Sequence, residues 1–245
     1  MDAAAVVQIA GYLIALAFGV YAIRGWRRRS ERVTAGLGIA IDGRTGADIL
    51  AGLVLAGWAM TAIYVAERLA HGISAHKATP DFAADAGIGL FLVLSALVDE
   101  VTMRDMLVSG LTRLLGGRSI AAVLIAAAVF GMTHMFFAGA SPLSVLSNCL
   151  GGVAYGLAFV LTGRIWLGLG LHFAWNFVQG PVLGFIVSGH VLGGGLYRIV
   201  DRGPTWLTGG DYGPEGGAIG LAMRFAVIGA VVVWSRSVSR RPATA

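Results

Sequence analysis

Seven long apolar stretches follow one another along the chain, separated by short polar segments. Each is near the ~20 residues that an α-helix needs to cross the hydrocarbon core of a bilayer. The stretches cover residues 4–24, 46–67, 86–112, 119–138, 144–163, 165–187 and 216–234. The pattern therefore predicts an all-α fold: a polytopic transmembrane helix bundle of about seven spans, forming a single integral-membrane domain over residues 1–245.

The composition agrees with a membrane bundle. Hydrophobic residues make up 57% of the 245 residues, charged residues only 13%, and the mean hydropathy is +0.78. A water-soluble domain of this length needs more charge to cover its surface. The 37 glycines suit the packing of helices in a membrane, because small residues let their backbones approach closely.

The placement of arginine predicts how the bundle is oriented. Segment 24–32, directly after the first stretch, holds five arginines and is therefore expected in the cytoplasm, with the N-terminus outside. Alternation of the spans then puts the C-terminus in the cytoplasm, on the same side as twelve of the eighteen basic residues. The net charge of +5 thus indicates contact with anionic lipids, and no nucleic-acid partner is expected.

Ionisable side chains within the predicted spans are few, and each is a functional candidate because a charge is costly to bury in a membrane. In the spans from residue 86 onward, and with the amide of Asn176 included, they are Asp99, Glu100, Arg104, Asp105, His134, His172, Asn176 and Arg224. Glu100 and Arg104 are four residues apart and are expected to form an ion pair on one helix face. Asp99 points ~100° away from Glu100 and so does not share this ion pair. We therefore expect Asp99, and not Glu100, to be the carboxylate that takes part in catalysis.

The candidate residues come from three spans, which supply an acid, a histidine, and a histidine with an amide. His172 and Asn176 share one face of their helix because they are four residues apart. If the three helices converge, the carboxylate can take a proton from a water that a histidine orients. The second histidine and the amide can then stabilise an oxyanion. This set is typical of a hydrolase without a covalent nucleophile, and no Ser-His-Asp signature is present.

Three short motifs contain these residues: Asp99-Glu-Val-Thr-Met-Arg104, Phe130-Gly-Met-Thr-His134 and His172-Phe-Ala-Trp-Asn176. In this order they resemble the Glu-Glu-x-x-x-Arg, Phe-x-x-x-His and His-x-x-x-Asn motifs of the CPBP family. That family comprises the CAAX-processing and bacteriocin-processing intramembrane endopeptidases, including the Rce1-type and Abi proteins. The resemblance covers about residues 86–234.

The resemblance implies a role for each residue. Asp99 stands at the position of the general base, His134 helps to hold the water, and His172 with Asn176 forms the oxyanion site. Glu100 and Arg104 support that site. The family implies a glutamic-type, metal-independent protease that needs no cofactor. Its substrate would be a peptide or a prenylated or otherwise lipidated peptide in a prokaryotic cytoplasmic membrane.

One departure from the family pattern leaves two alternatives open. Asp99 replaces the first glutamate and is one methylene shorter, which withdraws the carboxylate by over ~1 Å, and such a displacement can lower a rate ~10²-fold. The chain could therefore be an altered or inactive homologue that acts as a membrane binding, assembly or immunity factor for another membrane protein. It could also be an enzyme acting on isoprenoids or other lipids, because acid clusters can hold Mg²⁺ and diphosphate.

Overall fold

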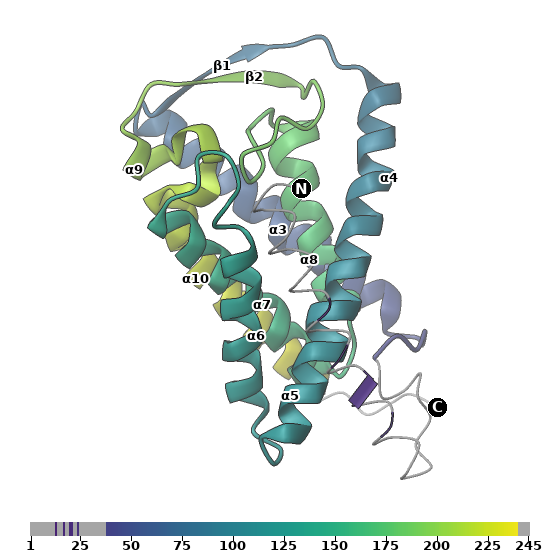
Figure 1. Ribbon diagram of the computed structural model, residues 1–245. Coiled ribbons are helices and arrows are strands. Elements are labelled where there is room, and N and C mark those ends of the chain that lie inside the picture. Colours follow the sequence, from purple (N-terminus) through teal and green to yellow (C-terminus); the bar gives the residue numbers. More distant parts are fainter. Residues whose placement is uncertain (1–12, 14–16, 18–19, 22–23, 25–37, 240–245) are drawn as a thin grey trace.

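The computed structural model describes residues 38–239 together with Leu13, Ala17, Val20, Tyr21 and Arg24. The predicted span 4–24 and the arginine-rich segment 24–32 lie almost entirely outside these residues. The described chain is mostly helical, with its helices arranged as an elongated bundle (Figure 1).

Among the described residues, six helical segments form the bundle. They are α3 (Thr45–Leu69), the continuous run of α4 (Phe82–Asp99), η1 (Glu100–Val108) and α5 (Ser109–Leu114), α6 (Ser119–Thr133), α7 (Pro142–Thr162), α8 (Trp166–Phe177) with η2 (Val178–Val182), and α10 (Ala218–Ser239). The η1 and η2 segments are π-helical. The bundle follows the predicted apolar stretches closely, because each stretch buries its backbone hydrogen bonds within one helix.

Four helices of the described chain are long and apolar enough to cross a membrane: Thr45–Leu69, Phe82–Leu114, Pro142–Thr162 and Ala218–Val238. Helix α6 is apolar but shorter, with 15 residues. Two predicted spans are therefore helical over less than their expected length, since 119–138 is α-helical only to Thr133 and 165–187 is helical only to Val182. The number of seven spans and the orientation stay predictions.

Glycines allow the closest helix contacts. A Cβ on Gly52 of α3 would lie 2.6 Å from the carbonyl oxygen of Leu167 on α8, and Gly170 of α8 meets α3 at the same place. Helix α7 packs between α6 and α10, and Gly152 brings its backbone against Ala127 of α6. Helices α3, α6, α7, α8 and α10 thus pack against one another. Helix α4 packs mainly against α8.

A small sheet caps one end of the bundle, which is called the sheet end below. Strand β1 (Ile73–Lys77) pairs antiparallel with β2 (Tyr197–Asp201), so that Ile73 lies opposite Asp201. Three short helices complete the cap: α9 (Thr205–Thr208), η3 (Gly210–Tyr212) and η4 (Pro214–Gly216). The sheet is an addition to the predicted all-α bundle and joins two inter-helix segments more than 100 residues apart.

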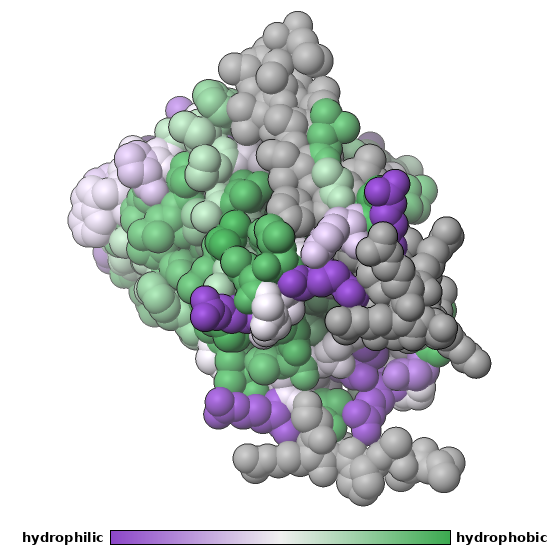
Figure 2. Space-filling model, turned by 60° about the horizontal axis from the view of Figure 1, so that its bottom comes forward, coloured by the Kyte–Doolittle hydropathy of each residue, from purple (hydrophilic) through white to green (hydrophobic). Residues whose placement is uncertain are grey.

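The opposite end, called the arginine end, collects basic residues at the ends of helices and on the segments between them. These are Arg44, Arg113, Arg118, Arg164 and Arg236. Arg164 pairs with Asp48 at the start of α3, and Trp234 near the end of α10 donates a hydrogen bond to the same carboxylate. Figure 2 tilts this end toward the viewer and shows hydrophilic residues along its lower edge beneath a largely hydrophobic surface.

Candidate active site

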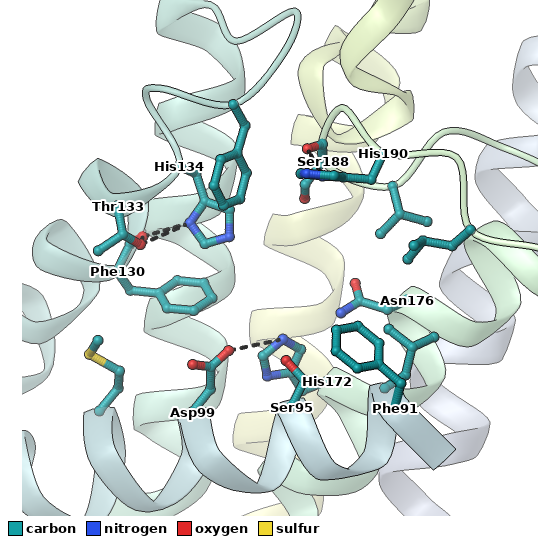
Figure 3. A pocket seen from close by; sticks show the side chains of 15 residues that line it. Phe91, Ser95, Asp99, Phe130, Thr133, His134, His172, Asn176, Ser188 and His190 are labelled. Atoms are coloured by element: carbon teal, nitrogen blue, oxygen red, sulfur yellow. Dashed lines mark hydrogen bonds and ion pairs between the residues drawn. The ribbon is translucent and has the colours of Figure 1, made fainter. Parts of the chain in front are cut away.

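A cavity of about 330 Å³ lies between α4, α6, α8 and the segment that follows η2 (Figure 3). Four of the six predicted site residues line it: Asp99, His134, His172 and Asn176. The other two, Glu100 and Arg104, are buried beside it. The structure thus brings together residues from three helices that are up to 77 positions apart in the sequence.

Asp99 faces the cavity because it continues a stripe along α4. Phe91, Ser95 and Asp99 follow one another at four-residue spacing, and all three line the cavity. The π-helix begins at the next residue, a feature often found at functional sites. The hydroxyl of Thr102 donates a 2.7 Å hydrogen bond to the carbonyl of Val98, which supports the backbone at this transition.

Glu100 and Arg104 form the ion pair that their spacing predicts, with 3.4 Å between Arg104 Nε and Glu100 Oε1. The guanidinium lies 4.5 Å above the ring centroid of Phe130 and 5.2 Å from that of Tyr155. Aromatic faces favour a cation at this distance. Gly168 gives Glu100 its space, because a Cβ at that position would collide with Glu100 Oε2.

His172 lies between the two acids. Its Nε2 is 4.0 Å from Asp99 Oδ2, and its Nδ1 is 3.4 Å from Glu100 Oε1. Its ring stacks on Tyr155 with 4.9 Å between centroids and 14° between planes. The helix geometry correctly directs Asp99 and Glu100 in different directions, yet one imidazole reaches both. The sequence did not indicate this bridge, because it depends on how α8 packs against the π-helix.

His134 caps the C-terminal end of α6 and turns one nitrogen toward the cavity. Its Nδ1 lies 2.8 Å from the carbonyl oxygen of Phe130. Since a carbonyl only accepts, Nδ1 carries the hydrogen, and the neutral ring presents Nε2 as an acceptor to the cavity (Figure 3). Thr133 also donates to the Phe130 carbonyl, at 2.7 Å. The Phe-x-x-x-His spacing therefore fixes the orientation of the imidazole.

The segment after η2 adds residues that the sequence analysis did not single out. Val187, Ser188, His190 and Leu192 line the cavity on its side toward the sheet end. Ser188 adopts a left-handed backbone conformation with φ of 48°, which is strained for a residue with a Cβ. No periodic pattern marks this segment, so neither its position nor its conformation could be read from the sequence.

A buried carboxylate holds this segment in place. Glu215 accepts a 2.7 Å hydrogen bond from the Ser188 hydroxyl with one oxygen. Its other oxygen accepts from Trp175 Nε1 at 2.9 Å and from Arg224 Nη2 at 2.8 Å. The Arg224 guanidinium also lies 3.6 Å from the Trp175 ring centroid. Arg224, which the sequence flagged as an arginine in an apolar span, is thus the ion-pair partner of Glu215.

Comparison with known protein families matches residues 86–178 to the family described as type II CAAX prenyl endopeptidase Rce1-like. The matched segment includes all six predicted site residues and runs from within α4 to the end of α8. No curated protein and no solved structure matches the chain significantly.

Proposed function

We propose that this chain, which belongs to the Rce1-like family of CAAX-type intramembrane endopeptidases through its residues 86–178, hydrolyses a peptide bond with a water that Asp99 activates. One observation carries the proposal: Asp99, His134, His172 and Asn176, from three different helices, line the same cavity. The family and the four long apolar helices make the chain an integral membrane protein. The cavity is therefore a site at which peptide and bilayer can meet.

The proposed reaction uses Asp99 and His134 to orient the water. One hydrogen of the water points to the Asp99 carboxylate and the other to His134 Nε2, which leaves a lone pair for the carbonyl carbon of the substrate. As the carbon–oxygen bond forms, Asp99 takes the proton. The carbon–nitrogen bond then breaks, and this proton leaves with the amine.

His172 and Asn176 support the developing oxyanion. They lie one turn apart on α8 and both line the cavity, so an imidazole N–H and an amide N–H can converge on the same oxygen. Glu100 lies beside His172 Nδ1 and helps to fix the ring, while Arg104 balances the charge of Glu100. These two residues position the site and do not touch the substrate.

The walls of the cavity favour an apolar or lipidated substrate. Its lining includes Phe91, Leu92, Met103, Phe137 and Leu192. On α4, Phe91 is also well exposed on the outside of the bundle, as are its neighbours Leu90 and Leu94. A substrate with a membrane-embedded or prenylated segment could thus approach along α4, so we propose a peptide of this class as the partner.

The test compares cleavage of prenylated and non-prenylated membrane peptides by the purified full chain in liposomes. Asp99→Ala and Asp99→Asn are expected to lower the rate by ~100-fold or more, because they remove the base. Asp99→Glu is expected to retain or raise it, since a glutamate brings the carboxylate closer to the water. Asp211→Asn, an exposed acid outside the cavity, serves as the matched control.

EDTA separates this chemistry from the alternatives. A metal-free reaction is expected to proceed unchanged in EDTA. Cleavage by Asp99→Asn at the native rate would rule out Asp99 as the base. If neither the native chain nor Asp99→Glu cleaves any peptide, the proposal fails. Binding to another membrane protein, or Mg²⁺-dependent turnover of an isoprenoid diphosphate, would then be sought.

A further inference from the structure

A further buried acid lies at the sheet end, away from the cavity described above. Glu67, in the last turn of α3, is fully buried, and neither of its carboxylate oxygens has a hydrogen-bond partner. None of the ion pairs formed within the described part of the chain includes it. A buried carboxylate without a partner is strongly unfavourable, so the charge is neutralised either by a proton or by something that the surroundings supply.

Glu67 lines a small cavity of about 70 Å³, enough for an ion and a water. The cavity lies where the end of α3 meets the sheet and the turns of the cap, near β1 and β2 in Figure 1. Its lining comprises Glu67, Ile73, Gly184, Phe185, Ile186, Ile199, Asp201, Thr208, Gly210 and Gly213. It shares none of these residues with the active-site cavity.

A second carboxylate reaches the same cavity from the surface. Asp201, at the end of β2, accepts a 2.7 Å hydrogen bond from the Thr208 hydroxyl and a 3.0 Å bond from the Gly203 backbone. The residue is exposed, so it connects the buried cavity with the medium. Two carboxylates that line one cavity repel each other, and a cation between them converts this repulsion into attraction.

The other groups around the cavity suit a hard cation. Gly184, Gly210 and Gly213 all have positive φ values, of 77°, 55° and 95°. Glycines in this conformation let the backbone and its carbonyls approach a bound ligand closely. The lining contains no histidine or cysteine, only carboxylate, hydroxyl and backbone oxygens as donors. Calcium prefers such an all-oxygen set, whereas zinc and copper prefer nitrogen and sulfur.

We propose that Glu67 and Asp201 bind a divalent cation, Ca²⁺, in this cavity. The site would join α3, β2, the turn around Thr208 and the segment at Gly184. Three residues later this segment enters the active-site cavity at Val187. The arginine-based orientation places the sheet end outside the cell, where a weak site with Kd on the order of 10⁻⁴–10⁻³ M is typical.

The test measures Ca²⁺ binding to the full chain in detergent by isothermal titration, and thermal unfolding with and without Ca²⁺. The native chain is expected to bind one ion and to unfold at a higher temperature in its presence. Glu67→Gln keeps the side-chain shape and should weaken binding at least 10-fold, while its unfolding temperature no longer responds to Ca²⁺. Asp201→Asn should act in the same direction and leaves the core intact, because Asp201 is exposed.

Asp211→Asn is the control, because Asp211 is an exposed acid of the same end that does not line this cavity. It should bind Ca²⁺ like the native chain. The proposal is overturned if the native chain shows no saturable binding, which would mean that Glu67 is neutralised by a proton alone. It is equally overturned if both Glu67→Gln and Asp201→Asn bind as the native chain does, or if Asp211→Asn loses as much affinity as they do.

Discussion

Buried charges in this protein are compensated in different ways, residue by residue. Glu215 finds three donors within the chain, and its ion pair with Arg224 is almost completely shielded from solvent. Glu100 shares its charge with Arg104 and the ring of His172. Because removing one member of a buried pair leaves the other charge without compensation, each such residue has a large expected effect on stability.

Glu215→Gln is expected to lower the free energy of unfolding by about 3–5 kcal/mol, because Arg224 would remain charged and buried without its carboxylate. Thermal and denaturant unfolding in detergent would measure the loss. The double variant Glu215→Gln/Arg224→Met should recover part of it, since it removes both charges. Equal unfolding temperatures for the native chain and Glu215→Gln would show that the pair does not stabilise the fold.

The motif residues were predictable because their spacing on helices encodes which of them share a face. This reasoning put His172 and Asn176 on one helix face but left the convergence of the three helices as a condition; the structure meets it, because Asp99, His134, His172 and Asn176 line one cavity. Ser188 and Glu215 were not predictable in the same way. Their positions depend on irregular backbone after η2 and before α10, where no periodicity relates sequence to direction.

At the scale of whole elements, the apolar stretches in the sequence predicted where the described helices lie, but they predicted the ends of these helices poorly. Helix α6 stops at Thr133 because the His134 side chain bonds the Phe130 carbonyl and the chain turns there. The strands Ile73–Lys77 and Tyr197–Asp201 each have five residues and pair although they are more than 100 positions apart in the sequence. Pairing between such distant short segments leaves no local signal, so the sheet could not be predicted.

The contact between α3 and α8 gives a prediction at this scale. Gly52→Ala is expected to destabilise the bundle by about 1–3 kcal/mol, because its new methyl group would overlap the α8 backbone. Gly57→Ala, on the same helix, meets nothing within 4 Å and should be neutral or slightly stabilising through better helix propensity. Parallel thermal unfolding of the two variants would check this. Equal loss in both would contradict the close contact.

For the molecule as a whole, the two ends differ in chemistry. The arginine end carries Arg113, Arg118 and Arg164 near the segments that join helices, whereas the sheet end carries most of the acids among the described residues, including Asp81, Asp201 and Asp211. Because Lys and Arg set the orientation of a membrane protein more than Asp and Glu do, the arginine end is the one expected in the cytoplasm. The active-site cavity is bordered by loop residues of the sheet end, so orientation decides from which side soluble parts of a substrate arrive.

Single-cysteine labelling tests the orientation. In a Cys149→Ala background, Lys77→Cys at the sheet end should react with a membrane-impermeant maleimide added to intact cells. Arg118→Cys, between α5 and α6, should react only after the membrane is opened, because the arginine end is expected in the cytoplasm. The reverse pattern would invert the expected topology and would place the cavity rim on the cytoplasmic side.

In the π-helical segment Glu100–Val108, the number of residues is constrained more strictly than the identity of most of them. Each residue added to or removed from a helix rotates everything beyond it by ~100°. A deletion between Glu100 and Arg104 would therefore leave the helix long and apolar, with every motif residue still present, yet rotate Arg104 and the residues that follow away from Glu100. Related chains should accordingly tolerate many substitutions on the lipid-facing side of this segment but hardly any insertion or deletion within it.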